Sequence, residues 1–280
     1  MFFGLKIGYK LLIMILASPS PAALLLTALT AAAYAWPAIR SRSMTGHVAR
    51  IWVAVAWLLH AVLLGQSLLG QPAYFGFATA LSMTAWLVAT VYAIESRVYP
   101  QLTTHWVLSA LGAVVVVLAA FFPGKSMTGD TSFWLPLHLA LGVASYGLFG
   151  MAVVHAWYLG RTEARLRSAA EPHSGLPLLT LERLTYHFVL SGFILLSATL
   201  VFGYGFGDVV YGHGHAWRWN HKSVFSVMSW CTFAVLLVGR FGFGWRGKRA
   251  VAVLYLGSAF LLLAYVGSRF VMEVILGQRS

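Results

Sequence analysis

The chain has 280 residues, of which 60% are hydrophobic and only 9% are charged. Soluble globular domains contain roughly 45–50% apolar and about 25% charged residues, so the composition excludes an ordinary soluble domain. The formal net charge of +12 does not favour a nucleic-acid partner, because the basic residues lie between apolar runs, where membrane proteins carry them.

The first 17 residues place two lysines before a short apolar run, which is the pattern of a signal peptide. No A-x-A cleavage site follows this run. We therefore interpret residues 1–17 either as an interfacial leader or as an extension that results from a wrongly assigned start codon. Residues 18–280 are interpreted as one integral membrane domain.

Eight apolar runs have nearly the ~20 residues that a helix needs to cross ~30 Å of hydrocarbon. They predict an all-α, polytopic integral membrane protein with a bundle of about eight transmembrane helices. The expected helices span about residues 20–38, 50–70, 74–95, 102–122, 133–159, 184–206, 222–239 and 250–275.

Most lysines and arginines lie in the loops after the first, third, fifth and seventh of these helices. Because cytoplasmic loops are enriched in basic residues, we expect these four loops to be cytoplasmic and both termini to lie outside.

Two of these loops carry further signals. Residues 160–183 are expected to form a solvated linker rather than a docking site. The loop at 240–249 places four cations around Trp245, which either hold anionic lipid headgroups or only fix the topology, and we favour topology. Its glycines match G-x-G-x-x-G but lack the strand and helix context of a nucleotide site.

Four histidines lie within the apolar runs: His60, His138, His155 and His187. Carboxylates are essentially missing from the membrane centre, which weighs against a proton-driven transporter. The single cysteine, Cys231, excludes an intramolecular disulfide and a four-cysteine metal site. Histidines without such partners suit haem iron better than zinc.

Small residues share a helical face with two of these histidines. His138 is followed by Gly142 and Ser145 at i+4 and i+7, and His187 by Ser191 at i+4. Small residues allow close approach of a flat cofactor, but they also serve interhelical hydrogen bonding, and the sequence leaves both interpretations open.

Depth restricts which histidines can share one iron. With ~1.5 Å of rise per residue, His187 lies about 6 Å inside the cytoplasmic face, His60 about 15 Å deep, and His138 about 8 Å below the outer face. His60 can therefore pair with either of the others, whereas His138 with His187 is the least plausible pair.

The outer segment 208–222 contains three histidines and two tryptophans. Its H-x-H pair, His213 and His215, is a weak metal signal. Trp217 and Trp219 form either an interfacial aromatic belt or a surface on which a flat ring stacks, and the belt is the more common role.

Five stretches of the second half follow one another in an order that resembles a known family. They are His138 with Ser145 and Tyr146; Pro177 to His187; Trp217, Trp219, Asn220 and Lys222; Arg240 to Ala250 with its G-W-R-G core; and Tyr265, Gly267, Ser268 and Arg269. Together they resemble the cytochrome c assembly proteins of the CcsA and CcmC type, most closely the HemX/YpjD-like branch.

The resemblance implies haem binding and haem handling at the outer face of a bacterial cytoplasmic membrane, with no catalytic residues, so we do not expect an enzyme. Implied partners are haem, membrane lipid, and apocytochrome c or another cytochrome assembly protein. The residues implied for the cofactor are His60, His138 and His187 as candidate axial ligands of haem iron, and Trp217, Trp219 and His221 as further haem contacts.

This chain departs from the family pattern at three positions: Asn220 replaces an aspartate, His221 a proline, and Val238 a histidine. Two other classes of function remain open. One is a small-molecule or proton transporter that uses the same histidines, and the other is a non-catalytic scaffold or regulator whose histidines only connect helices.

Overall fold

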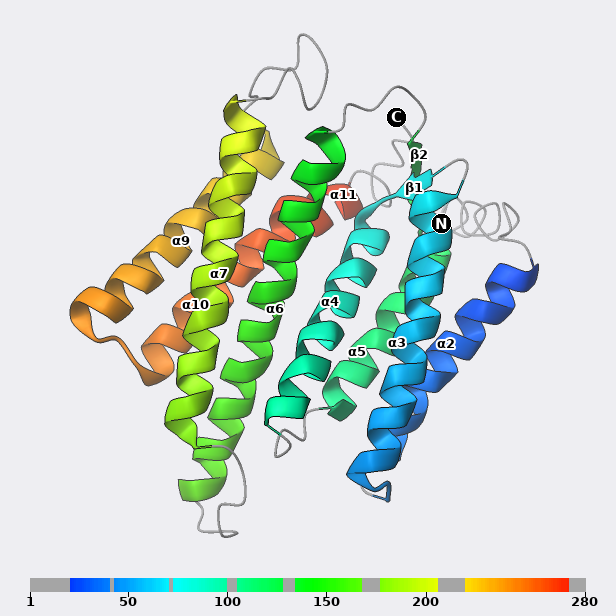
Figure 1. Cartoon of the computed structure of the whole chain (residues 1–280). Helices are drawn as coiled ribbons and strands as arrows, with labels where there is room; N and C mark the ends of the chain where they lie inside the picture. The colour runs from blue at the N-terminus through cyan, green and yellow to red at the C-terminus, as the bar shows by residue number, and fades with distance from the viewer. Residues whose placement is uncertain are drawn as a thin grey trace, which may run out of the picture. The chain divides into compact units, whose positions relative to one another are not determined.

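The computed structural model describes residues 21–40, 43–70, 73–99, 105–127, 134–167, 177–205 and 220–271. The leader at residues 1–17 lies outside this part, as do Trp217 and Trp219. Over the described residues the chain forms eight long helices and one pair of short strands (Figure 1). The predicted all-α membrane fold is confirmed.

Nine α-helices, one of them a single short turn, follow one another along the described residues. They are α2 (Pro21–Ile39), α3 (Gly46–Leu69), α4 (Phe77–Val98), α5 (His105–Phe121), α6 (Trp134–Arg167), α7 (Leu178–Gly205), α9 (His221–Phe243), α10 (Gly247–Leu262), and the short α11 (Ser268–Phe270). Seven spans are long and apolar enough to cross a membrane, and the last of them comprises α10 and the turn that continues it, Gly247–Gly267. The eighth apolar helix, α5, has 17 residues.

Two compact units make up the fold. The first contains α2, α3, the start of α4, and α5, and the second contains the rest of α4 with α6, α7, α9 and α10. The boundary falls within α4, between Ser82 and Met83.

The first unit packs around Tyr34 of α2, which is almost completely buried. Gly112 of α5 allows this packing, because a Cβ at that position would lie 2.9 Å from the Tyr34 ring. Ala56 of α3 and Val116 of α5 complete the buried cluster. Small residues at helix contacts let neighbouring backbones approach, as is usual in membrane bundles.

A short antiparallel strand pair, absent from the sequence prediction, lies in the first unit. Strand β1 (Ala73–Phe75) pairs with β2 (Lys125–Met127), with Tyr74 opposite Ser126. The pairing joins the segment between α3 and α4 to the segment after α5. Each strand has only three residues, too few to produce a readable alternating pattern.

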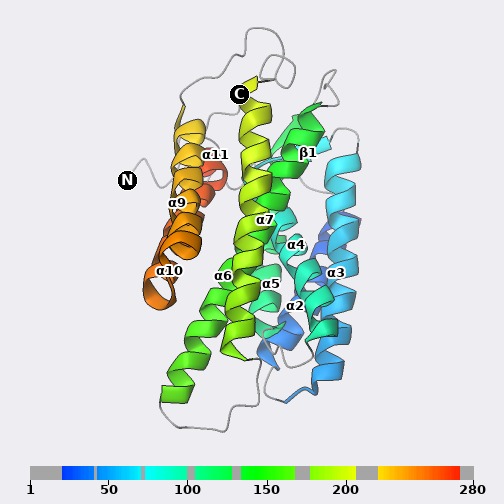
Figure 2. The ribbon, with the colours of Figure 1, turned by 60° about the vertical axis from the view of Figure 1, so that its left-hand side comes forward.

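The second unit has a larger core, centred on two stacked phenylalanine rings. Phe149 of α6 and Phe233 of α9 lie 3.7 Å apart with nearly parallel planes. Gly192 of α7 and Gly257 of α10 lie against these rings, and a Cβ on Gly257 would lie 2.8 Å from Phe233. Helices α6 and α7 run side by side in both views (Figures 1 and 2).

Two element boundaries differ from the sequence prediction. Helix α6 continues to Arg167 and α7 begins at Leu178, so part of the predicted linker at 160–183 is helical. The residues after Gly160 include good helix formers such as arginine, glutamate and alanine. Helix α6 therefore continues into this charged segment beyond the end of the apolar run. The predicted last helix begins at Gly247, and a π-helical turn, η1 (Leu263–Gly267), interrupts it.

Candidate functional site at the end of the second unit

His60 is buried in the first unit, where hydroxyl groups contact both of its ring nitrogens. The Tyr34 hydroxyl of α2 lies 3.3 Å from Nδ1, and the Ser82 hydroxyl of α4 lies 2.7 Å from Nε2. The imidazole is only 1% exposed. Ligation of iron by His60 would require one of these two contacts to break, whereas interhelical hydrogen bonding uses both.

His138 lies in the second unit, near the start of α6, and is 7% exposed. The backbone of Thr199 in α7 and the ammonium group of Lys222 in α9 both lie within interaction range of its ring. A Cβ on Gly142, one turn further along α6, would lie 3.6 Å from the Thr199 methyl group. Gly142 therefore allows helix α7 to pack closely against α6 at this position.

Two tyrosines connect this end of α6 to the last helices. The Tyr146 hydroxyl donates a hydrogen bond to the carbonyl of Leu261 at the end of α10. Tyr265 of the π-helical turn lies close enough to Tyr146 to interact with it, and its ring faces the Lys222 ammonium group at 5.5 Å. We call these four residues, His138, Tyr146, Lys222 and Tyr265, the His138–Lys222 cluster.

The π-helical turn belongs to this cluster. Such turns are rare, and within α-helices they occur frequently at functional sites. Here the turn contains Tyr265 and is followed by Ser268, whose hydroxyl donates to the carbonyl of Ala264 at 2.9 Å. The sequence showed the Y-x-G-S-R element but carried no signal for the π geometry.

Asn220 caps the helix that carries Lys222. Its side-chain oxygen accepts a hydrogen bond from the Ser223 backbone at 3.0 Å, and the Ser223 hydroxyl accepts one from the Asn220 backbone. Asparagine and aspartate are equally good at this position, so the replacement of the family's aspartate preserves the cap and removes a negative charge. His221 follows, exposed, in the first turn of α9.

The tryptophans predicted to contact haem lie outside the described residues. In the sequence, Trp219 directly precedes the capping residue Asn220. His187, the third predicted ligand, lies on an exposed face of α7 together with Ser191. The structure thus gives the three membrane histidines named as ligands three different environments.

A buried carboxylate lies near the end of α4, away from the helix centre to which the prediction of missing acidic residues applies. Glu95 is 7% exposed, and its Oε2 accepts a hydrogen bond from Nε2 of His155 at 2.9 Å. Among the described residues, Nδ1 of His155 and Oε1 of Glu95 have no hydrogen-bond partner. The sequence placed Glu95 at a helix end, and nothing in it indicated a partner 60 residues away.

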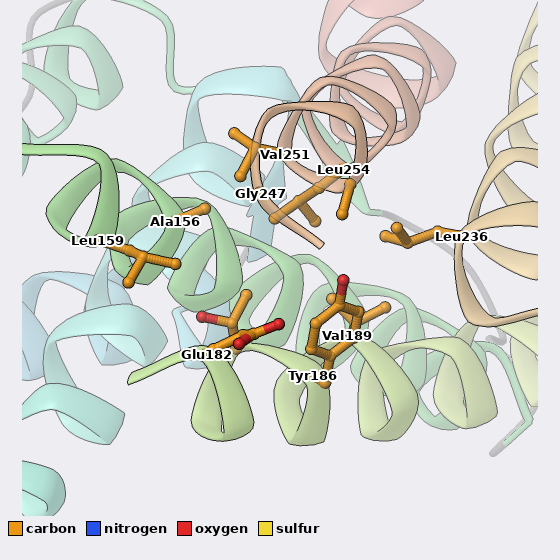
Figure 3. A pocket seen from close by; sticks show the side chains of 11 residues that line it. Ala156, Leu159, Glu182, Tyr186, Val189, Leu236, Gly247, Val251 and Leu254 are labelled. Atoms are coloured by element: carbon orange, nitrogen blue, oxygen red, sulfur yellow. The ribbon is translucent and has the colours of Figure 1, made fainter. Parts of the chain in front are cut away.

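A narrow crevice lies at the opposite end of α7 (Figure 3). Its walls are mostly apolar side chains of α6, α7, α9 and α10, with the Glu182 carboxylate among them. That carboxylate lies 2.8 Å from Nη1 of Arg240 and 3.4 Å from Nε of Arg246. The lining contains no histidine, so the crevice offers no imidazole to a haem iron.

The donor set of the His138–Lys222 cluster fits haem. An imidazole can ligate iron, an ammonium group can neutralise a propionate, and His221 brings a second imidazole on the helix that carries Lys222. Within the described residues no group of three or more metal-ligating side chains occurs, and haem iron requires no more than two from the protein.

Fold and cluster together define a multi-pass helical membrane protein with a histidine-containing polar site at one end of its second unit. The chain matches the family model described as cytochrome C assembly protein over residues 55–276. It therefore belongs to the cytochrome c assembly protein family, which confirms the resemblance seen in the sequence.

Individual relatives cover most of the chain. Inner membrane protein YpjD of Escherichia coli is 29% identical over 81% of this chain and 88% of its own length. Cytochrome c biogenesis protein CcsA of Prochlorococcus marinus is 23% identical over 81% of this chain and 73% of its own length. An uncharacterized 28.8 kDa protein of Azospirillum brasilense is 29% identical over 88% of this chain. No solved structure matches.

Proposed function

We propose that this chain binds haem at the His138–Lys222 cluster and acts in cytochrome c assembly or haem handling at the outer face of the bacterial cytoplasmic membrane. One observation carries the proposal. Lys222 lies within electrostatic range of His138 and 5.5 Å from the Tyr265 ring, so residues that span more than 120 positions in the sequence lie at one end of a single compact unit. Each belongs to a stretch that resembles the family.

Each residue of the cluster has a role in this proposal. His138 would ligate the haem iron, and Lys222 would neutralise a haem propionate. Tyr146 anchors α6 to α10 through the Leu261 carbonyl, which holds His138 in position relative to the last helices. Trp217 and Trp219 supply the stacking surface, and His221 is the candidate second ligand. Bound haem would contribute the iron coordination chemistry, and the protein its orientation.

The relatives support the wider role. A CcsA relative is named a cytochrome c biogenesis protein, and the YpjD relative is named an inner membrane protein. By analogy, this chain presents haem to apocytochrome c or to another assembly protein. We propose a binding and delivery role without a catalytic residue, and a topology with both termini outside.

Absorbance spectra of detergent-purified protein test the proposal, as isolated, after haem addition and after dithionite reduction. We expect a haem signal in the wild type, its loss in His138→Ala, and its retention in His187→Ala, which changes an exposed histidine of the same unit. Folded wild-type protein without a Soret band, even with added haem, would refute haem binding. Equal loss in both variants would refute the assignment of His138.

One observation favours a second candidate function, proton-coupled transport of a small molecule. The buried Glu95–His155 pair holds titratable groups inside the membrane span, where such groups often relay protons. Proton-dependent uptake into proteoliposomes that is lost in Glu95→Gln would favour transport. If replacing His60, His138 and His187 together changed stability and left haem content unchanged, a scaffold role would be favoured instead.

A further inference from the structure

The α9–α10 turn, by which we mean the connecting residues 244–246 together with the first residues of α10 up to Arg249, is held in a defined shape. Gly244 and Gly247 adopt left-handed backbone angles, with φ of 64° and 62°. The Trp245 backbone donates a hydrogen bond to the Gly239 carbonyl at 2.9 Å, and its ring lies where a Cβ of Gly239 would be. Gly244 and Gly247, which match part of a nucleotide-binding motif, therefore allow the backbone conformation of this turn.

The turn carries surplus positive charge. Arg240, just before it, is balanced by Glu182 at 2.8 Å, and its guanidinium lies 4.4 Å from the centre of the Tyr186 ring. Arg246 reaches the same carboxylate only at 3.4 Å and is 63% exposed along its side chain. Lys248 and Arg249 are also exposed. One carboxylate thus faces two arginines, with two further cations beside it.

Large apolar side chains are exposed next to these cations. Phe241 and Phe243, in the last turn of α9, are 69% and 75% exposed. Helix α9, and α10 together with the π-helical turn that continues it, have the length and composition of membrane spans, so the turn that joins them lies at a membrane surface. Cations beside exposed aromatic rings form an amphipathic edge that suits the boundary between headgroups and acyl chains.

We propose that the α9–α10 turn binds an anionic phospholipid, with the phosphate held by Arg246, Lys248 and Arg249 and the acyl chains in contact with Phe241 and Phe243. This site is independent of the proposed haem site. The ligand we propose is a bilayer lipid rather than free phosphate, because phosphate alone would make no contact with the phenylalanines. Fixing the orientation of the protein in the membrane requires only the basic residues. The exposed phenylalanine rings beside them are explained by lipid binding and not by topology.

Lipid retention measured by native mass spectrometry tests the proposal, with purified protein offered equal amounts of phosphatidylglycerol and phosphatidylcholine. A basic residue near an anionic surface contributes about fivefold in affinity. We expect the wild type to prefer phosphatidylglycerol. The triple variant Arg246→Gln, Lys248→Gln, Arg249→Gln should lose this preference by more than about tenfold.

A matched control removes three exposed cations elsewhere, as Arg50→Gln, Arg97→Gln, Arg161→Gln, and should keep the preference. The double variant Phe241→Ser, Phe243→Ser should retain less phosphatidylglycerol, and excess inorganic phosphate should not displace the lipid from the wild type.

Absence of a preference in the wild type, or equal loss in the control variant, would overturn the proposal. Displacement by inorganic phosphate would assign the turn to free anions instead. Haem spectra report on the other site and are unaffected by these outcomes.

Discussion

The two units both bury a histidine, and they surround it differently. In the first unit, hydroxyls of Tyr34 and Ser82 lie at both ring nitrogens of His60, so the imidazole connects three helices. In the second unit, His138 lies within electrostatic range of the Lys222 ammonium group, near the ends of α6 and α9. A histidine in a membrane helix is therefore not in itself evidence of a ligand, and the groups around the ring distinguish the roles.

The largest expected effect on stability concerns His155, which, like His60, is hydrogen-bonded to a side chain of another helix. Glu95→Ala would leave the buried imidazole without its carboxylate, and breaking a buried pair in this way costs about 3–5 kcal/mol. Replacing both partners, as Glu95→Leu with His155→Leu, should restore most of the stability because no polar group remains unpaired. Unfolding free energies from SDS titration measure both variants.

The double variant also separates structure from proton transport. A pair that only connects α4 and α6 can be replaced by leucines without loss of function. Restored stability with abolished uptake in proteoliposomes would show that the pair has a role beyond packing.

The next effect is expected at His60. His60→Ala leaves two buried hydroxyls unsatisfied, which should lower the unfolding free energy by about 2–4 kcal/mol. Haem bound per folded molecule should not change. Leu58→Ala, two residues away on an exposed position of the same helix, is the control and should have a much smaller effect. Loss of haem from well-folded His60→Ala protein would make His60 a ligand after all.

The membrane fold could be predicted from sequence because apolar length is a local property. The first helix was expected at about 20–38 and lies at Pro21–Ile39. The π-helical turn could not, because the apolar run continues through it and hydropathy does not register one extra residue per turn.

The candidate site was predictable only in part. The residue types and their order resembled a family, and this resemblance identified His138, Lys222 and Tyr265 as members of separate stretches. Their meeting at one end of the unit depends on how α6, α9 and α10 pack, which spacing along the chain does not specify. For the same reason, the sequence did not indicate the hydrogen-bond partners of His60 or the pairing of Glu95 with His155.

Packing against the stacked phenylalanines offers a test of whether the second unit positions the cluster. Gly257→Ala places a Cβ 2.8 Å from the Phe233 ring, and overpacking of this kind costs about 1–3 kcal/mol. Because α10 leads directly into the turn with Tyr265, we also expect weaker haem binding. Gly65→Ala, inside α3 of the first unit, has open space around it, so it should raise the unfolding free energy by about 0.5–1 kcal/mol through helix propensity and leave the haem titration unchanged.

The smallest effect is expected at the α9 cap, where it separates the two consequences of the departure from the family pattern. Asn220→Ala removes the cap and should cost about 1 kcal/mol, whereas Asn220→Asp keeps it and should change stability by only a few tenths. If the missing charge limits haem delivery, Asn220→Asp should raise haem transfer to apocytochrome c at unchanged stability. Equal transfer by both proteins would mean that the carboxylate is dispensable here, and that the cap is what this position contributes to the site.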